Sequence, residues 1–183
     1  MAATLPATDG AGADSAATSY CAQVGGQVQS RVPEYGTNGP SQLVLSGKHN
    51  FCVFTSPSDG SRIYIFADTL YTKKPTLAAL AYYAEVPIGK CNGNPASCYC
   101  TLLGGTDLFG GINAAGGAWV YSGSTPDPDL ETCIFPDLSS IDSWGLTYHS
   151  AGIIRGIDLS TVLRYANPYA KKRAKEVFNV QKG

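Results

Sequence analysis

The sequence is poor in charge and has no long hydrophobic run. Charged residues make up 15% of its 183 residues, against about 25% in average soluble proteins. Thirteen basic and fourteen acidic side chains give a net charge of −1, which provides no overall attraction for nucleic acid. No stretch approaches the roughly 20 apolar residues that a membrane-spanning helix needs. We therefore expect neither a nucleic-acid partner nor a transmembrane segment.

Residues that commonly carry catalysis are also scarce. The two histidines, His49 and His149, stand in no motif that would place either beside an activated nucleophile. The glycine-rich stretch from Gly104 to Gly117 lacks the lysine and the helix that follow a phosphate-binding loop. Four acidic residues lie close together in the sequence: Asp127, Asp129, Glu131 and Asp137. They lack the pattern of a calcium-binding loop, so calcium binding is a minor alternative. We expect no enzyme activity, no metal and no cofactor.

Glycine, proline and tyrosine take the place of the missing charge. The chain contains 21 Gly, 11 Pro and 11 Tyr residues, a composition that suits short strands and many turns. Such a polar but weakly charged sequence is common in exported and in self-assembling proteins. The first residues are mostly Ala, Thr, Gly and Asp, without the basic and apolar regions of a signal peptide. We expect residues 1–14 to form a flexible tail.

An internal repeat predicts that most of the remaining chain consists of two diverged copies of one module. Four segments recur in the same order: Tyr20-Cys21 with Gly25-Gly26 as Tyr99-Cys100 with Gly104-Gly105, Cys52-Val53-Phe54 as Cys133-Ile134-Phe135, Asp59-Gly60-Ser61 as Asp137-Leu138-Ser139, and Leu77–Ala84 as Leu159–Ala166. The offsets between copies vary only from 78 to 82 residues, which is hard to attribute to chance. The predicted modules span residues 15–91 and 92–172, and a basic tail, residues 173–183, follows them.

Both copies predict the same mixture of helices and strands. A helix carries the Tyr-Cys pair and ends at Gly-Gly, because glycine tolerates the left-handed conformation at a helix C-terminus. Alternating β-branched and aromatic residues predict strands at residues 27–32, 42–45, 51–54 and 62–66, and at 118–121, 132–135 and 144–148. A second helix, residues 76–85 and 159–166, closes each copy. The predicted fold is α+β, with two tandem modules of helix, antiparallel sheet and helix that disulfides stabilise.

Six cysteines in a small, weakly charged chain favour disulfides over free thiols. The repeat gives each copy one equivalent pair, and the two cysteines without counterparts would pair at the junction between the copies. The predicted disulfides are Cys21–Cys52, Cys100–Cys133 and Cys91–Cys98. A closed loop of about 30 residues contributes about 3 to 4 kcal/mol in the loop-entropy model. A four-thiolate zinc site is the alternative, but the paired C-x₂₋₄-C knuckles of such sites are absent.

These motifs resemble a family of exported bacterial proteins labelled domain of unknown function 333, whose members are also called haemolysins. The second copy matches in Asn94-Pro95-Ala96-Ser97, Tyr99-Cys100, Gly104-Gly105, Cys133-Ile134-Phe135 and Trp144-Gly145, and the first in Cys52-Val53-Phe54 and Asp59-Gly60-Ser61. The cysteine that the family places soon after Asp-Gly-Ser is missing from both copies. The resemblance implies an exported fold with disulfides, and it implies no catalytic residues.

Three classes of function remain. The favoured class is a non-catalytic exported structural protein that assembles with itself, such as a subunit of an extracellular filament or surface layer. The alternative is a cell-envelope binding module or protein inhibitor that grips a protein or glycan through exposed aromatics, and a hydrolase is disfavoured. The residues expected at the interaction surface are Trp119, Tyr121, Trp144, Tyr148, Lys171, Lys172 and Arg173. We expect the protein outside the cell or in the cell envelope.

Overall fold

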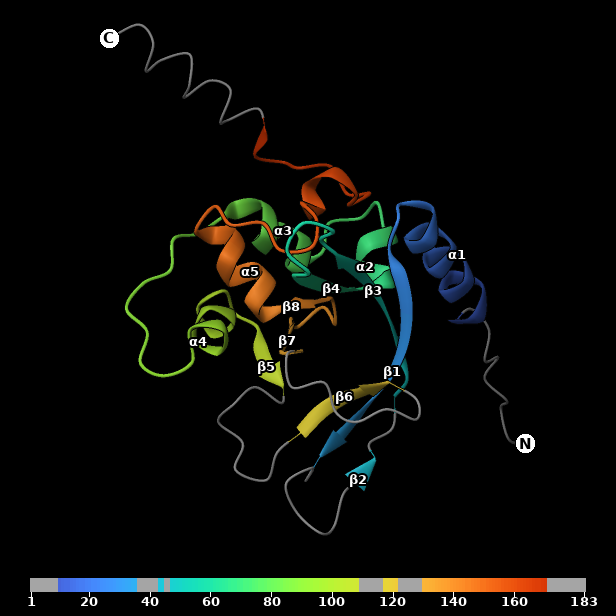
Figure 1. Ribbon diagram of the computed structural model, residues 1–183, viewed down its shortest axis with the longest axis horizontal. Coiled ribbons are helices and arrows are strands. Elements are labelled where there is room, and N and C mark those ends of the chain that lie inside the picture. The colour runs from blue at the N-terminus through green and yellow to red at the C-terminus, as the bar shows by residue number, and fades with distance from the viewer. Residues whose placement is uncertain (1–9, 36–42, 45–46, 109–116, 122–129, 171–183) are drawn as a thin grey trace, which may run out of the picture.

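The computed structural model describes residues 10–35, 43–44, 47–108, 117–121 and 130–170, and Figure 1 shows their arrangement. The described residues form helices and an antiparallel sheet, so the predicted α+β class is confirmed. No helix among them is long and apolar enough to cross a membrane.

The first half of the described chain runs from α1 to α3. Its elements are α1 (Gly10–Gln23), β1 (Gln27–Tyr35), β2 (Leu43–Val44), β3 (His49–Thr55), β4 (Arg62–Phe66), α2 (Ala67–Tyr71) and α3 (Leu77–Ala84). Helix α1 begins inside the range 1–14 that composition predicts as a flexible tail. Ala11 and Ala13 favour a helix there, although they alternate with two glycines.

The second half runs from α4 to a short 3₁₀ turn. Its elements are α4 (Pro95–Leu102), β5 (Thr106–Leu108), β6 (Gly117–Tyr121), β7 (Thr132–Ile134), β8 (Ser140–Asp142), α5 (Ser143–Ser150) and the 3₁₀ turn η1 (Leu159–Thr161). Local sequence explains α4. The Asn94 side chain accepts hydrogen bonds from the N–H groups of Ala96 and Ser97 (2.8 and 3.3 Å), and Gly104 follows the helix at φ 84°.

One sheet contains strands from both halves. Its order is β2-β1-β3-β4-β8-β7-β5, with antiparallel pairing between neighbours. The halves meet at its centre, where Ile65 of β4 pairs with Ile141 of β8. Strand β6 is an exception to the order. It belongs to the second half of the sequence but pairs with β1 of the first half, with Trp119 opposite Pro33.

The central strands are buried on both faces. On one face, residues from all five helices and from β3, β4, β7 and β8 form the larger core, which includes Cys52, Ile65, Cys133 and Ile141. On the other face, Phe51, Val53, Tyr64, Phe66, Trp119 and Leu130 form a smaller aromatic core. Alternate residues of β3 and β4 therefore enter different cores, as the two-residue period of a strand requires.

The three disulfides are the pairs that the repeat predicts: Cys21–Cys52, Cys91–Cys98 and Cys100–Cys133. The first joins α1 to β3, and the third joins α4 to β7. Both lie in the larger core with no exposed surface. The disulfide between Cys91 and Cys98 is partly exposed and closes the short segment that leads into α4.

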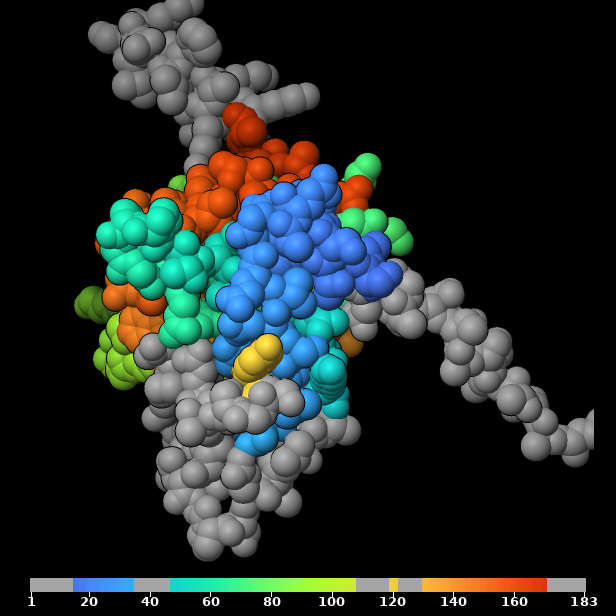
Figure 2. Space-filling model, turned by 45° about the vertical axis from the view of Figure 1, so that its right-hand side comes forward, coloured from blue at the N-terminus to red at the C-terminus, as the bar shows by residue number. Residues whose placement is uncertain are grey.

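The C-terminal part of helix α1 lies beside the segment that follows η1. Figure 2 shows α1, in blue, beside the orange residues that precede the end of the described chain. The hydroxyl of Tyr20 donates a hydrogen bond to the carbonyl oxygen of Val162 (2.7 Å). The guanidinium of Arg164 lies over the rings of Tyr20 and Tyr71, 5.4 and 4.2 Å from their centroids. These contacts hold the segment after η1 against α1 and α2.

Two predictions of secondary structure are wrong. Residues 144–148, predicted as a strand, belong to helix α5. The Asp142 side chain caps this helix by accepting from the N–H of Gly145 (2.9 Å). A Cβ atom at Gly145 would lie 2.7 Å from the side chain of Ile63, so glycine lets α5 pack closely on β4. Capping and packing together override the strand propensity of the aromatic residues.

Residues 159–166, predicted as a helix, form only the turn η1. Backbone groups of this segment are used in tertiary hydrogen bonds. The N–H of Leu159 donates to the Tyr82 hydroxyl (3.0 Å), and the N–H of Arg164 donates to the carbonyl oxygen of Leu70 (3.2 Å). Residues 159–164 therefore pack against α2 and α3 and do not continue as a helix.

Candidate functional site

Exposed apolar side chains gather around the C-terminal end of α5. The described chain has nine large hydrophobic residues that are exposed, and five of them lie on two segments that meet there. We call these five residues the α5 surface: Val86, Ile88, Tyr148, Ile153 and Ile154. Scattered exposed apolar residues need no explanation, whereas a concentration of them is typical of an interaction site.

Several contacts bring the two segments of the α5 surface together. The carboxylate of Glu85, which ends α3, lies 3.4 Å from Nε2 of His149 in α5. The hydroxyl of Tyr99 in α4, a helix that packs against α5, donates to the carbonyl oxygen of Val86 (2.6 Å). The N–H of Ile153 donates to the carbonyl oxygen of Tyr148 (2.9 Å). Figure 1 shows the chain leaving α3 beside the end of α5.

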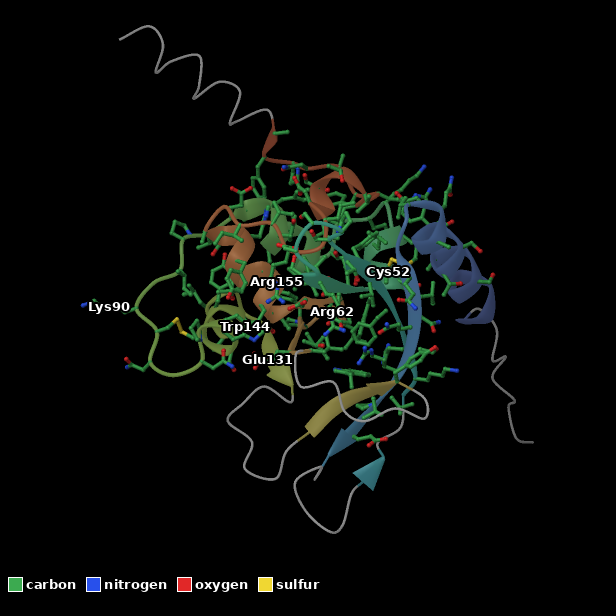
Figure 3. The ribbon with its side chains drawn as sticks, viewed as in Figure 1. Cys52, Arg62, Lys90, Glu131, Trp144 and Arg155 are labelled. Atoms are coloured by element: carbon green, nitrogen blue, oxygen red, sulfur yellow. A yellow bond between two sulfur atoms is a disulfide. The ribbon has the colours of Figure 1, made fainter. Side chains whose placement is uncertain are left out.

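Aromatic and cationic side chains extend along α5 from this surface. The rings of Trp144 and Tyr148 lie 5.8 Å apart, one helical turn from each other. The guanidinium of Arg155 lies over the Tyr148 ring, 5.2 Å from its centroid. Figure 3 shows Trp144 on α5 and Arg155 on the segment that follows this helix. An aromatic ring with an arginine on its face is a common element of protein interfaces.

The predicted interaction residues do not form one surface. Tyr148 is exposed and belongs to the α5 surface, and Trp144 is partly buried beside it. Trp119 is only 3% exposed, so its assignment to an interaction surface is wrong. It fills the aromatic core against Phe51 and Phe66, with ring centroids 5.3 and 5.9 Å away. Its strand neighbour Tyr121 is exposed.

Several other predicted positions lie outside the described residues. They are Lys171, Lys172 and Arg173 of the predicted surface, the basic tail 173–183, and the acidic residues Asp127 and Asp129.

Both histidines stack on aromatic rings in the described structure. His149 is 9% exposed and stacks on the Tyr82 ring, with centroids 3.7 Å apart. His49 stacks on Phe66 at 4.7 Å and meets the edge of Trp119 at 5.4 Å. Both imidazoles therefore serve as planar packing groups in the described structure. The Tyr82 hydroxyl, for its part, bonds to Asp158 and to the N–H of Leu159.

Three buried carboxyl groups lie at the base of α4 and α5, and sequence analysis did not identify them together. We call Asp107, Glu131 and Asp142 the carboxyl cluster. Ser143, the first residue of α5, links them. It follows Asp142 in sequence, its N–H donates to the carbonyl oxygen of Glu131 (2.8 Å), and its hydroxyl lies near Asp107. Glu131 accepts from the Asn94 side chain with both oxygens (2.8 and 3.1 Å).

Burial dominates the electrostatics of this cluster. It raises the pKa of Asp107 to about 6 and that of Asp142 to about 7. The hydroxyls of Ser97 and Ser143 lower the Asp107 pKa slightly, yet neither makes a hydrogen bond of normal geometry to its carboxyl oxygens. For Asp142, backbone N–H groups and the charge of Arg155 oppose the effect of burial.

Two surface cavities are lined by described residues. One, of about 370 Å³, lies beside α4 and is lined by Asn92, Asn94, Ser97, Cys98, Thr101 and Leu102. The Asn94 side chain in it is already hydrogen-bonded to Glu131 and to α4. The other, of about 330 Å³, lies between α2 and the start of α3. There, Asp137 and Ser139 accept from the N–H groups of Leu77 and Ala78. Among the described residues, no three His, Cys, Asp or Glu side chains are placed to hold a metal ion.

Comparison with known proteins adds no further constraint. No protein-family model, no curated protein and no solved structure matches the chain. The resemblance to the domain of unknown function 333 therefore depends on the motif residues alone.

Proposed function

We propose that the two halves are diverged copies of one module that share a single sheet. Each half has a helix, four strands and a helix in sequence, and three of its strands are neighbours in the sheet in the same order, β1-β3-β4 and β5-β7-β8. The cysteine in the middle of these three strands, β3 or β7, has equivalent pairing partners on the two neighbouring strands. Cys52 pairs with Val28 and Ile65, and Cys133 pairs with Asp107 and Ile141. Unrelated folds would have no reason to share this register.

Details of the turns support the same proposal. Asp59 accepts from the N–H and the hydroxyl of Ser61, and Asp137 does the same for Ser139. The residue between them has a left-handed backbone in both turns, with φ 72° at Gly60 and φ 64° at Leu138. Leucine rarely adopts this conformation, so its presence favours a turn inherited from a glycine-containing copy.

The contact between the two proposed copies is a closed interface. Ile65 and Ile141 occupy equivalent positions in the two copies, and they pair with each other where β4 meets β8. A contact in which equivalent residues meet is two-fold symmetric and closed, so it uses both copies' surfaces at once. A third copy from another molecule has no β4 or β8 edge left to join. Assembly therefore requires a different surface.

We propose that the protein is an exported, non-catalytic protein that assembles with itself through the α5 surface. The observation that carries this proposal is the concentration of exposed apolar side chains at the end of α5. Three disulfides support export, because such bonds persist mainly in oxidising compartments. A net charge of −1 leaves little repulsion between copies.

Sedimentation velocity over a range of concentrations tests the assembly. The wild-type chain is expected to form larger species as concentration rises, whereas Ile153→Asp/Ile154→Asp is expected to stay monomeric. Each substitution places a charge where an interface would exclude water, and both positions are about half exposed in the monomer, which spares the fold. Leu138→Asp is the matched control, because Leu138 is 76% exposed but lies at the turn between β7 and β8. A wild-type chain that stays monomeric throughout would contradict the proposal.

A cell-envelope binding module is the second candidate. Its support is the exposed ring of Tyr148 beside the partly buried Trp144 and Arg155, a combination suited to stacking against a sugar or a partner side chain. A monomeric wild-type chain that binds an envelope protein or glycan, and loses that binding in Tyr148→Ala, would favour this function.

A further inference from the structure

The carboxyl cluster has no counterpart in the first half of the fold. Register places Asp107 where the first half has Val28, because both residues pair with the disulfide cysteine of the middle strand. The same register makes Asp142 equivalent to Phe66, because each follows the isoleucine, Ile141 or Ile65, that pairs with the disulfide cysteine. Val28 and Phe66 pack in apolar cores. Ionisable groups therefore occupy positions that the same architecture otherwise fills with apolar side chains.

We propose that Asp107 and Asp142 of the carboxyl cluster form a pH-sensitive element, which holds α4 and α5 on the sheet in acid and loosens them when these two carboxyls ionise. This inference does not depend on the proposed assembly. Ionising a carboxyl group in a buried position is costly unless cations or hydrogen bonds compensate the charge. In this cluster the compensation is incomplete.

The surroundings of each carboxyl show which compensation exists. Asp107 faces the hydroxyls of Ser97 in α4 and Ser143 in α5, and the carboxylate of Glu131 repels it. Both Asp107 oxygens are buried without a hydrogen-bond partner of normal geometry in the described structure. The N-terminal ends of α4 and α5 favour negative charge nearby, but their first N–H groups are bonded to Asn94 and Asp142.

Asp142 is better compensated but still buried. Its carboxylate accepts from the N–H of Gly145, and further backbone N–H groups of Tyr64 and Trp144 favour its charged form. Arg155 is the cation that acts on it. Arg62, on the adjacent strand β4, lies over the Tyr64 ring at 5.5 Å. Glu85 and His149 contact each other at the opposite end of α5.

The direction of the pH effect follows from these environments. Carboxyl groups whose folded-state pKa lies above the unfolded value of about 4 stabilise the fold most when protonated. Because the raised pKa values are about 6 for Asp107 and about 7 for Asp142, their contribution is present below about pH 4. It is lost as the pH rises from there to about 7. Asp59 and Asp137 have lowered pKa values and oppose this trend only in stronger acid.

Thermal unfolding at pH 4.5 and pH 7.5 measures the proposed effect. The wild-type Tm is expected to be about 5 °C or more higher at pH 4.5. Asp107→Asn and Asp142→Asn keep the shape of the side chain and, like the protonated acid, have one acceptor oxygen and a donor, but they cannot ionise. Each is expected to reduce the Tm difference, and the double variant to remove most of it. Asp59→Asn, on the exposed turn of the first half, is the control and should keep the full difference.

Amide hydrogen exchange on the wild-type chain locates the effect without any substitution. After correction for intrinsic exchange rates, protection of α4, α5 and β5 is expected to fall at least tenfold between pH 4.5 and pH 7.5 relative to α1, α2 and β1. Three results would overturn the proposal: a wild-type Tm as high at pH 7.5 as at pH 4.5, an unchanged Tm difference in the double variant, or equal loss of protection in both halves.

Discussion

The second glycine after each Tyr-Cys helix is required by the disulfide beside it. A Cβ atom at Gly26 would lie 2.3 Å from Sγ of Cys52, and one at Gly105 would lie 2.4 Å from Sγ of Cys133. Neither sulfur can move away, because each belongs to a disulfide that is fully buried in the larger core. The first glycine of each pair has a different role, since Gly25 and Gly104 have left-handed backbones.

Gly105→Ala is expected to lower the free energy of unfolding by about 2–3 kcal/mol, the usual effect of overpacking a rigid core. Chemical denaturation of the oxidised protein measures it. Gly89→Ala is the matched control, because a Cβ atom there would meet nothing within 4 Å and its backbone is not left-handed. An equally stable Gly105→Ala variant would show that the disulfide does not enforce this glycine.

At the scale of elements, the three disulfides differ in exposure. Cys21–Cys52 and Cys100–Cys133 are fully buried between a helix and a strand, whereas Cys91–Cys98 is partly exposed on the segment before α4. Thiol–disulfide exchange requires direct access of a thiolate to a sulfur atom. The two buried disulfides become accessible only when the helices leave the sheet.

A mild reductant without denaturant is therefore expected to open Cys91–Cys98 first. Alkylation followed by mass spectrometry should find label on Cys91 and Cys98 while the other four cysteines stay oxidised. Its loss should destabilise the fold least, because its short loop restricts the unfolded chain by only about 2 kcal/mol, against about 4 kcal/mol for loops of about 30 residues. Label that enters Cys100 and Cys133 at the same rate would contradict this account.

Elements defined by local patterns could be predicted from the sequence, and those defined by tertiary contacts could not. Strand β4 and helix α3 carry their own signals, as a run of β-branched and aromatic residues and an N-cap at Thr76. Strands β5 and β8 have three residues each and form through pairing with β7 and, for β8, also with β4. Helix α5 depends on its cap at Asp142 and on close packing against Ile63. The aromatic residues of α5 by themselves favour a strand, which the structure does not have there.

The candidate sites show the same limit at the scale of the whole molecule. The disulfide pairs follow from the repeat, and Tyr148 could be chosen as an exposed aromatic. Val86 and Ile153 lie far apart in sequence and meet only through the packing of α3 against α5. The burial of Trp119 depends on β6 crossing to β1, which no local pattern predicts. Asp107 stands 79 residues after Val28, the same offset as that between Cys21 and Cys100, so the repeat places an acidic residue at an apolar position.

The proposed assembly makes one surface of the whole molecule responsible for association. Strand edges are the main rival, because among the described residues β5 pairs only with β7 and leaves an edge open. An added strand would protect the backbone of that edge. Association through the α5 surface would instead protect residues on two segments that are distant in sequence.

Hydrogen exchange of the full chain at low and at high protein concentration tests this claim most directly. The account predicts that the amides of Val86, Ile88 and residues 148–154 gain protection as concentration rises, while those of β5 and β1 do not change. Protection gained along β5 or β1, or no concentration-dependent protection at all, would contradict the assembly through the α5 surface.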